Sequence, residues 1–189
     1  LDKSDLSRIE ERRKRLETRK KQIEAKIQAE AAEAAKQYVS SGCLVAHELG
    51  KVLAPDAILL NDGRSNGQFV ENYARRTLPG SLFKGGAGAG GWGAGAAFGA
   101  KMAAPQQDVV LARGDGFFEF GTPSAAIWAG AHHKAAFLSV VFVNGSYSTG
   151  TNGLRRSYPD GFASGAQCVG GTFDPPHRAH RALAETALD

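Results

Sequence analysis

The chain has 189 residues, of which 42% are hydrophobic and 22% are charged, as in an ordinary globular protein. No stretch approaches the roughly 20 apolar residues of a membrane span, and the first residues are charged rather than signal-like. The sequence therefore predicts a cytoplasmic protein with no membrane partner. Cys43 and Cys168 lie far apart without metal-type spacing, which indicates free, reduced thiols.

Residues 1–37 contain no Gly or Pro and consist mostly of Glu, Lys, Arg, Ala and Gln, which predicts one long helix. Most of the net charge of +4 comes from this part of the chain, where acidic and basic residues alternate. That pattern is typical of a solvated helix face, so no nucleic-acid partner is expected. A thin apolar stripe consists of Leu6, Ile9, Leu16, Ile23 and Ile27. It suits a linker helix, a helix docked on another domain or subunit, or a short coiled coil.

Residues 38–189 have a different pattern, in which short apolar runs alternate with polar turns and helical segments. The apolar runs predict buried strands, at 57–60, 108–112 and 137–143. Each run ends in a polar turn, and these turns are Asn61-Asp62-Gly63, Gly114-Asp115-Gly116 and Asn144-Gly145-Ser146. Helices are expected over 41–53, over 98–104 after a glycine-rich loop (85–97), and after Pro123.

This alternation predicts an α/β domain over 38–189, with a parallel sheet covered by helices on both faces. Ligands of such sheets lie beyond the carboxyl ends of the strands, where all three polar turns are expected. Asp115 offers a carboxylate and Asn144 a side-chain carbonyl, which are oxygen ligands that suit Mg²⁺. The glycines beside Asp115 let backbone amides approach an anion closely. The pair of turns indicates a cradle for a metal-bridged diphosphate, although Gly-Asp-Gly alone also marks ordinary turns.

Asp115 and Asn144 are 144 − 115 = 29 positions apart. With this spacing, roughly residues 40–175 resemble the C-terminal domain of thiamine diphosphate (ThDP) enzymes of the pyruvate decarboxylase, benzoylformate decarboxylase and acetolactate synthase group. The segment 85–100 is similar to that group's glycine-rich loop and helix. The resemblance implies Mg²⁺ ligands at Asp115, Asn144 and the Ser146 carbonyl, with Tyr147 close to the diphosphate. It also implies cofactor contacts at Arg64, Ser65, Gly88, Gly90, Gly114, Gly116 and Phe117.

Three features depart from the family pattern. Phe117 stands where the family has a serine after Gly-Asp-Gly, so one hydroxyl to the diphosphate is missing. Gly90 aligns with the bulky Leu or Met that wedges the cofactor into its bent conformation. Finally, the chain after Asp174-Pro175-Pro176 is shorter than the family's C-terminal end.

The resemblance implies a ThDP- and Mg²⁺-dependent lyase, decarboxylase or carboligase that acts on a small 2-oxo acid, 2-hydroxy acid or 2-hydroxyacyl-CoA. In that family the activating Glu belongs to a separate pyrimidine-binding domain, and no Glu here has a matching context. The chain is therefore expected to act in a homo- or hetero-oligomer, with that domain on a second chain or a missing segment. The alternatives are a non-catalytic ThDP-domain-like regulatory or assembly subunit and, more distantly, a nicotinamide dinucleotide-binding domain.

Overall fold

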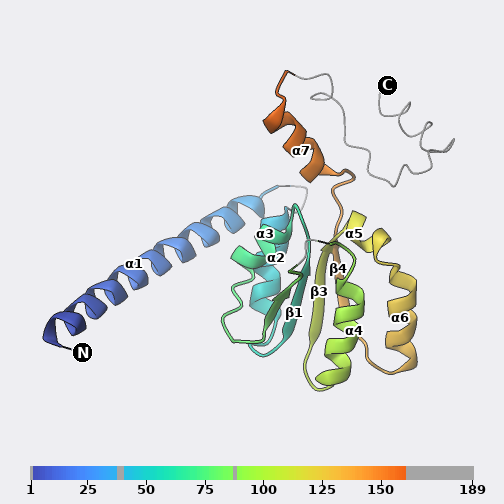
Figure 1. Ribbon diagram of the computed structural model, residues 1–189, viewed down its shortest axis with the longest axis horizontal. Coiled ribbons are helices and arrows are strands. Elements are labelled where there is room, and N and C mark those ends of the chain that lie inside the picture. The colour runs from blue at the N-terminus through green and yellow to red at the C-terminus, as the bar shows by residue number, and fades with distance from the viewer. Residues whose placement is uncertain (1, 38–40, 87–88, 161–189) are drawn as a thin grey trace. The chain divides into compact units, whose positions relative to one another are not determined.

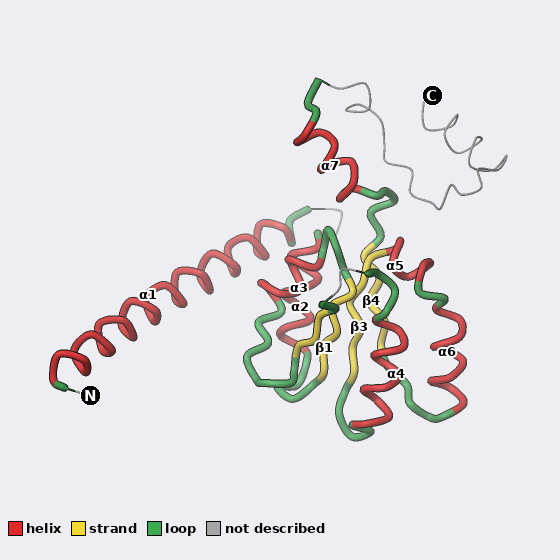
Figure 2. Tube along the Cα trace, viewed as in Figure 1, coloured by secondary structure: helices red, strands yellow, loops and turns green. Residues whose placement is uncertain are grey.

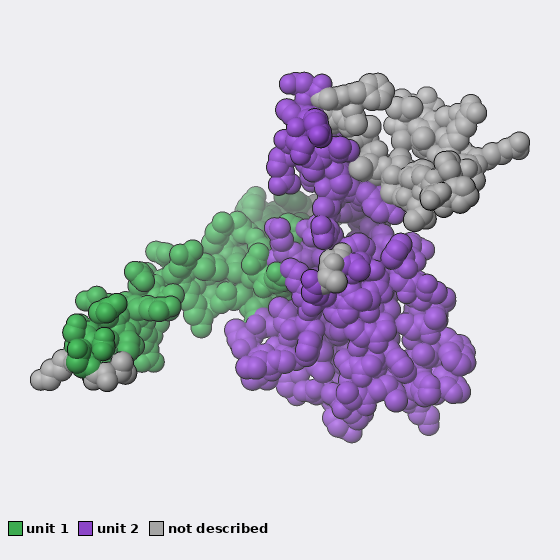
Figure 3. Space-filling view, viewed as in Figure 1, with its two compact units in different colours: residues 1–53, 69–75 green, residues 54–68, 76–189 purple. Residues whose placement is uncertain are grey.

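The computed structural model describes residues 2–37, 41–86 and 89–160 (Figures 1 and 2). Gly88, Cys168 and the segment after Asp174, about which the sequence made predictions, lie outside these residues. The chain divides into two compact units, drawn in different colours in Figure 3. One unit comprises residues 1–53 and 69–75, and the other comprises residues 54–68 and 76–189. No helix in the described part of the chain is long and apolar enough to cross a membrane.

The first unit is helical. Helix α1 (Lys3–Ala34) confirms the long helix that the composition predicted, and it begins at a capping box between Asp2 and Asp5. Near its end Ile27, Ala31 and Ala34 are buried, as are Ala46 and Leu49 of α2 (Gly42–Val52). By contrast Leu6, Ile9, Leu16 and Ile23 are between 42% and 54% exposed, so most of the predicted apolar stripe is uncovered.

The end of α3 (Gly67–Tyr73) also belongs to this unit. The Tyr73 hydroxyl donates a hydrogen bond to the Glu30 carboxylate, and this bond raises the pKa of Tyr73 to about 12. The Arg75 guanidinium lies 2.8 Å from the Glu24 carboxylate. These contacts tie α3 to the last turns of α1.

The second unit is built on a parallel four-stranded sheet in the order β2-β1-β3-β4. Strands β1 (Ile58–Asp62), β3 (Val109–Gly114) and β4 (Leu138–Phe142) match the predicted runs, and β1 and β3 each continue two residues farther than expected. Strand β2 (Leu82–Lys84) was not predicted. Every residue of β1 is buried, which is typical of a strand covered on both faces.

Helices α4 (Gly93–Ala103) and α6 (Pro123–His132) contact one another, and α4 packs on β1 and β3 (Figure 1). Their shared core combines aliphatic strand residues with small helix residues, and it contains Ile58, Leu60, Ala94, Ala97, Val109 and Leu111. Because α4 is built from Gly and Ala, it can approach the sheet closely. Helix α4 begins at Gly93, five residues before the predicted start, so the end of the glycine-rich segment is helical.

Three short helices that follow the polar turns, α3, α5 and α7, were also missed from the sequence. Helix α5 (Asp115–Phe120) starts directly at the end of β3, and α7 (Ser148–Ser157) starts directly after the turn that follows β4. Both helices therefore begin at the carboxyl edge of the sheet, where the sequence predicted only turns.

Gly95 lies in the first turn of α4 and is exposed, with nothing within 4 Å of an added Cβ. Gly95→Ala is expected to raise the free energy of unfolding by roughly 0.5–1 kcal/mol, because alanine loses less backbone entropy in a helix. Thermal denaturation followed by circular dichroism measures this change. A lower melting temperature would mean that the Gly95 position makes a contact that alanine disrupts.

Candidate functional site

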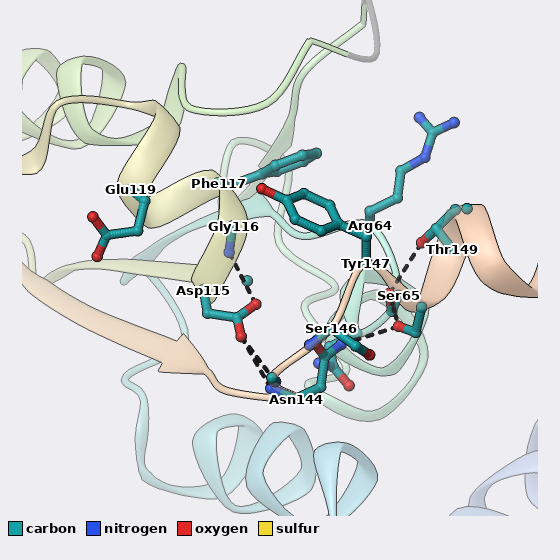
Figure 4. Close-up of a pocket in the computed structure, with 15 residues that line it drawn as sticks. Arg64, Ser65, Asp115, Gly116, Phe117, Glu119, Asn144, Ser146, Tyr147 and Thr149 are labelled. Carbon is teal, nitrogen blue, oxygen red and sulfur yellow. Dashed lines mark hydrogen bonds between the residues drawn. The ribbon is translucent and has the colours of Figure 1, made fainter. Parts of the chain in front are cut away.

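The turns after β3 and β4 meet at the carboxyl edge of the sheet (Figure 4). Asp115, the first residue of α5, accepts hydrogen bonds on Oδ2 from the backbone amides of Asn144 and Gly145, at 3.3 and 3.1 Å. Its Oδ1 accepts another from the Gly116 amide at 2.9 Å. The parallel sheet thus brings together two turns that lie 29 residues apart, as the order of strands predicted.

The turn that follows β4 is held by its own asparagine. Asn144 Oδ1 accepts a hydrogen bond from the Ser146 amide at 3.1 Å, while Asn144 Nδ2 donates to Ser148 Oγ at 3.1 Å. Gly145 between them has φ +64°, a left-handed conformation that favours glycine. Consequently the Asn144 side-chain oxygen lies on the same small turn as the backbone of Ser146.

Ser65 connects the turn after β1 to this group. Its Oγ lies 3.0 Å from Ser148 Oγ and 3.0 Å from Thr149 Oγ1, both in the first turn of α7. The turns after β1, β3 and β4 therefore bring polar side chains together at one edge of the sheet. Arg64, next in sequence, extends from the same turn with its guanidinium away from Asp115 in Figure 4.

These turns enclose a cavity of about 630 Å³, within the usual range for small-molecule sites. Arg64 is the only cation among the described residues that line it, whereas Asp115 and Glu119 are acidic. The predicted site residues that line it are Arg64, Ser65, Gly114, Asp115, Gly116, Phe117, Asn144, Ser146 and Tyr147. Gly145 of the predicted turn lines it too, as do five residues that the sequence did not single out, namely Asn66, Glu119, Ser148, Thr149 and Gly150.

The glycine-rich loop is anchored by Asp62, the last residue of β1, which is 2% exposed. Its carboxylate accepts hydrogen bonds from the backbone amides of Gly91 and Gly93, each at 3.1 Å to Oδ2. Asp62 therefore stabilises the first turn of α4, where a negative charge is favourable. Burial raises the pKa of Asp62, against the opposing effect of these amides and of Arg113.

Arg113 lies beside Asp62 on β3 and is fully buried, with its guanidinium 4.5 Å from the centre of the Phe118 ring. None of its three side-chain nitrogens has a hydrogen-bond partner among the described residues. Burial lowers the pKa of Arg113, and the charge of Asp62 opposes that shift. Arg113 therefore contacts α5 through Phe118 and acts electrostatically on Asp62, which holds the glycine-rich loop, but it does not line the cavity.

Gly90 does not line the cavity, because the Phe117 ring lies on it. A Cβ added at Gly90 would overlap Cγ, Cδ1 and Cε1 of Phe117, well inside the 3.0 Å that real Cβ atoms keep. Next to it, a Cβ on Gly91 would lie 2.8 Å from Gly121 Cα, and one on Gly121 would lie 2.6 Å from the Gly91 oxygen. Loop and α5 therefore pack backbone to backbone.

The family described as "Thiamine pyrophosphate enzyme, C-terminal TPP binding domain" matches residues 63–184, more than half of the chain. This chain belongs to that family. Thiamine pyrophosphate is another name for ThDP, so the match confirms the resemblance that the turns suggested. It also agrees with the parallel α/β fold.

The relatives that this chain matches are longer proteins. It is 34% identical over 135 residues to the acetolactate synthase large subunit of Mycobacterium tuberculosis, which covers 70% of this chain and 24% of that protein. It is 33% identical over 96 residues to the benzoylformate decarboxylase of Pseudomonas aeruginosa, covering 50% of this chain and 18% of that one. The chain thus spans about a quarter or less of the length of these relatives.

Among solved structures, the ThDP-dependent 4-hydroxybenzoylformate decarboxylase of Rhodococcus jostii matches 78% of this chain and 26% of its own. The TM-score is 0.57 and the sequence identity is 25%. This member of the ThDP family therefore resembles a C-terminal part of larger decarboxylases in both sequence and fold.

Proposed function

We propose that this chain supplies the diphosphate- and Mg²⁺-binding half of a ThDP-dependent active site. The observation that carries the proposal is the Asp115 carboxylate, which bridges the start of α5 and the Asn144-Gly145 turn at the mouth of the cavity. The cavity has the size for a small ligand and carries more carboxylate than guanidinium charge. A diphosphate held there needs a cation beside it, and carboxylate, amide and carbonyl oxygens suit Mg²⁺.

In this proposal the metal ligands are Asp115, the Asn144 side chain and the Ser146 carbonyl. The backbone of Gly114 and Gly116 and the side chains of Arg64 and Ser65 lie against the diphosphate. Phe117 and Tyr147 form the aromatic side of the cavity (Figure 4). ThDP, when bound, would supply a nucleophilic thiazolium carbon and a thiazolium ring that stabilises the carbanion left by C–C cleavage. This chain's residues fix the cofactor at the other end.

The reaction proposed for the complete protein is that of a lyase, decarboxylase or carboligase. The substrate class is a 2-oxo acid, 2-hydroxy acid or 2-hydroxyacyl-CoA. The names of the relatives, acetolactate synthase and benzoylformate decarboxylase, support this choice of chemistry. We place the protein in the cytoplasm.

A second domain is required by this proposal, because the activating Glu belongs to a pyrimidine-binding domain in the family. Helix α1 is the proposed linker or dock. Its apolar stripe is uncovered over Leu6, Ile9, Leu16 and Ile23. Along one side of the stripe Arg8, Arg12, Arg15 and Arg19 repeat at helical spacing and are exposed. The complementary surface would combine apolar side chains with carboxylates.

Binding of ThDP to the purified chain tests the proposal. Isothermal titration calorimetry should detect weak binding that requires Mg²⁺, and thiamine monophosphate should bind at least about tenfold more weakly, a loss of about 1.4 kcal/mol. The chain alone should show no decarboxylation or ligation of pyruvate or benzoylformate. Robust turnover by the isolated monomer contradicts the requirement for a second domain, and equal binding without Mg²⁺ contradicts the metal assignment.

The second candidate is a non-catalytic subunit with a regulatory or assembly role, which the departures at Gly90 and Phe117 favour. The two candidates differ when the pyrimidine-binding domain is present. A catalytic half-site gains turnover in that complex, whereas a non-catalytic subunit binds its partner and leaves turnover absent.

A further inference from the structure

Gly90 and Phe117 lie 117 − 90 = 27 positions apart, yet they occupy one space. Three atoms of the Phe117 ring stand where the first side-chain atom of residue 90 would be. A side chain at position 90 would therefore have to displace the Phe117 ring, together with the helix that carries it.

Helix α5 is held at both ends, so it cannot easily move away from the loop. At its start Asp115 accepts the backbone amides of the Asn144-Gly145 turn. At its end Gly121 lies against Gly91, at distances that leave no room for a Cβ on either residue. Phe117 stands between these anchors, and its ring is thereby pressed against Gly90.

The ring also lines the cavity, beside Tyr147 (Figure 4). The Tyr147 ring lies near Gly116, where an added Cβ would be 3.5 Å from Tyr147 Cε1, an ordinary contact distance. Phe117 thus separates Gly90 from the cavity, while the oxygen-rich end of the cavity lies around Asp115 and Asn144.

We infer that Phe117 and Gly90 are a coupled pair, in which the Phe117 ring takes the place of a side chain at position 90. The ring forms the apolar wall against which the thiazolium and pyrimidine part of ThDP rests. The second statement rests on the proposed function, whereas the coupling of the two residues does not. Phe117 is then a cofactor-positioning residue, and its loss weakens binding of the rings but not of the diphosphate.

A double-mutant cycle on the full chain tests the coupling, using Gly90→Leu, Phe117→Ala and the double variant. Without ligand, Gly90→Leu should lower the melting temperature by roughly 4–8 °C, because the new side chain and the Phe117 ring must fit into one space. In the Phe117→Ala background the same change should cost nothing or raise the melting temperature. Additive shifts would overturn the coupling. If Gly90→Leu alone fails to fold, the melting temperatures of the double variant and of Phe117→Ala still show whether the two positions are coupled.

Calorimetry with ThDP and with inorganic diphosphate, each with Mg²⁺, tests the wall. Phe117→Ala should weaken ThDP binding about tenfold, leave diphosphate binding within about twofold, and recover ThDP binding when Leu is added at position 90. Phe120→Ala, which removes a 76% exposed aromatic from the same helix, should change neither affinity. If Phe117→Ala lost affinity equally for both ligands, or lost none for ThDP, the assignment of Phe117 as the apolar wall would be wrong. Failure of wild type to bind either ligand would refute the proposed function and leave the melting-temperature cycle intact.

Discussion

Asp115→Ala is expected to abolish Mg²⁺-dependent binding of ThDP, with a loss of affinity on the order of 100-fold or more, about 2.7 kcal/mol. The substitution removes the one charged metal ligand proposed for this chain. It also removes the acceptor for three backbone amides, in Gly116, Asn144 and Gly145. The metal would lose its bridge, and the turn after β4 would lose its attachment to α5.

Calorimetric titration with ThDP at fixed Mg²⁺ measures this effect, and the melting temperature without ligand shows whether the variant stays folded. Asp108→Ala is the matched control, because Asp108 is an exposed carboxylate just before the opposite end of β3. It should leave affinity unchanged. Asn144→Ala should be milder than Asp115→Ala, since it removes a neutral ligand. Wild-type affinity in a folded Asp115→Ala protein would show that the metal lies elsewhere.

Gly91→Ala is expected to be more destabilising than Gly121→Ala, lowering the free energy of unfolding by about 2–5 kcal/mol. Two costs combine at this position. Gly91 has φ +88°, a conformation that strains any residue with a Cβ, and that Cβ would lie 2.8 Å from Gly121 Cα. Thermal or urea denaturation of the full chain measures the sum.

Gly121→Ala separates the two costs. Gly121 has φ −82° and ψ 11°, which alanine adopts without strain, but its Cβ meets the Gly91 backbone from the other side. We expect it to lose about 1–3 kcal/mol, the overpacking part alone. Equal stability of Gly91→Ala and the wild-type chain would mean that loop and α5 do not pack as described.

The sequence predicted the parts of the fold that depend on local pattern. β1, β3 and β4 are short apolar runs closed by polar turns, and the parallel arrangement follows from the helices between them. β2 was missed because it has only three residues, Leu82–Lys84, of which two are exposed, so it has neither length nor periodicity. Helix α5 was missed because it has only six residues and begins with Asp-Gly, which favours a turn, whereas α7 was missed because its glycines and hydroxyl residues favour turns when considered alone.

At the site, chain order and spacing sufficed to bring Asp115 and Asn144 together, since both follow neighbouring parallel strands. The supports of the site could not be inferred in this way. Asp62 belongs to a turn that the sequence associated with the cofactor, but its carboxylate is buried on the amides of Gly91 and Gly93. The departures at Gly90 and Phe117 looked independent, because no local rule connects a loop glycine with an aromatic residue 27 positions later.

The contact between Phe117 and Gly90 also restricts the order in which these residues can change. A chain with Leu at 90 and Phe at 117 would have to fit two groups into one space. A mutational path from a small residue at 117 and a bulky one at 90 therefore passes through glycine at 90 before it gains the phenylalanine. In the reverse path, Phe117 must be replaced by a small residue before a bulky residue returns at position 90. Transplanting either residue alone into a relative, or reverting either alone here, would therefore give an effect that depends on the other position.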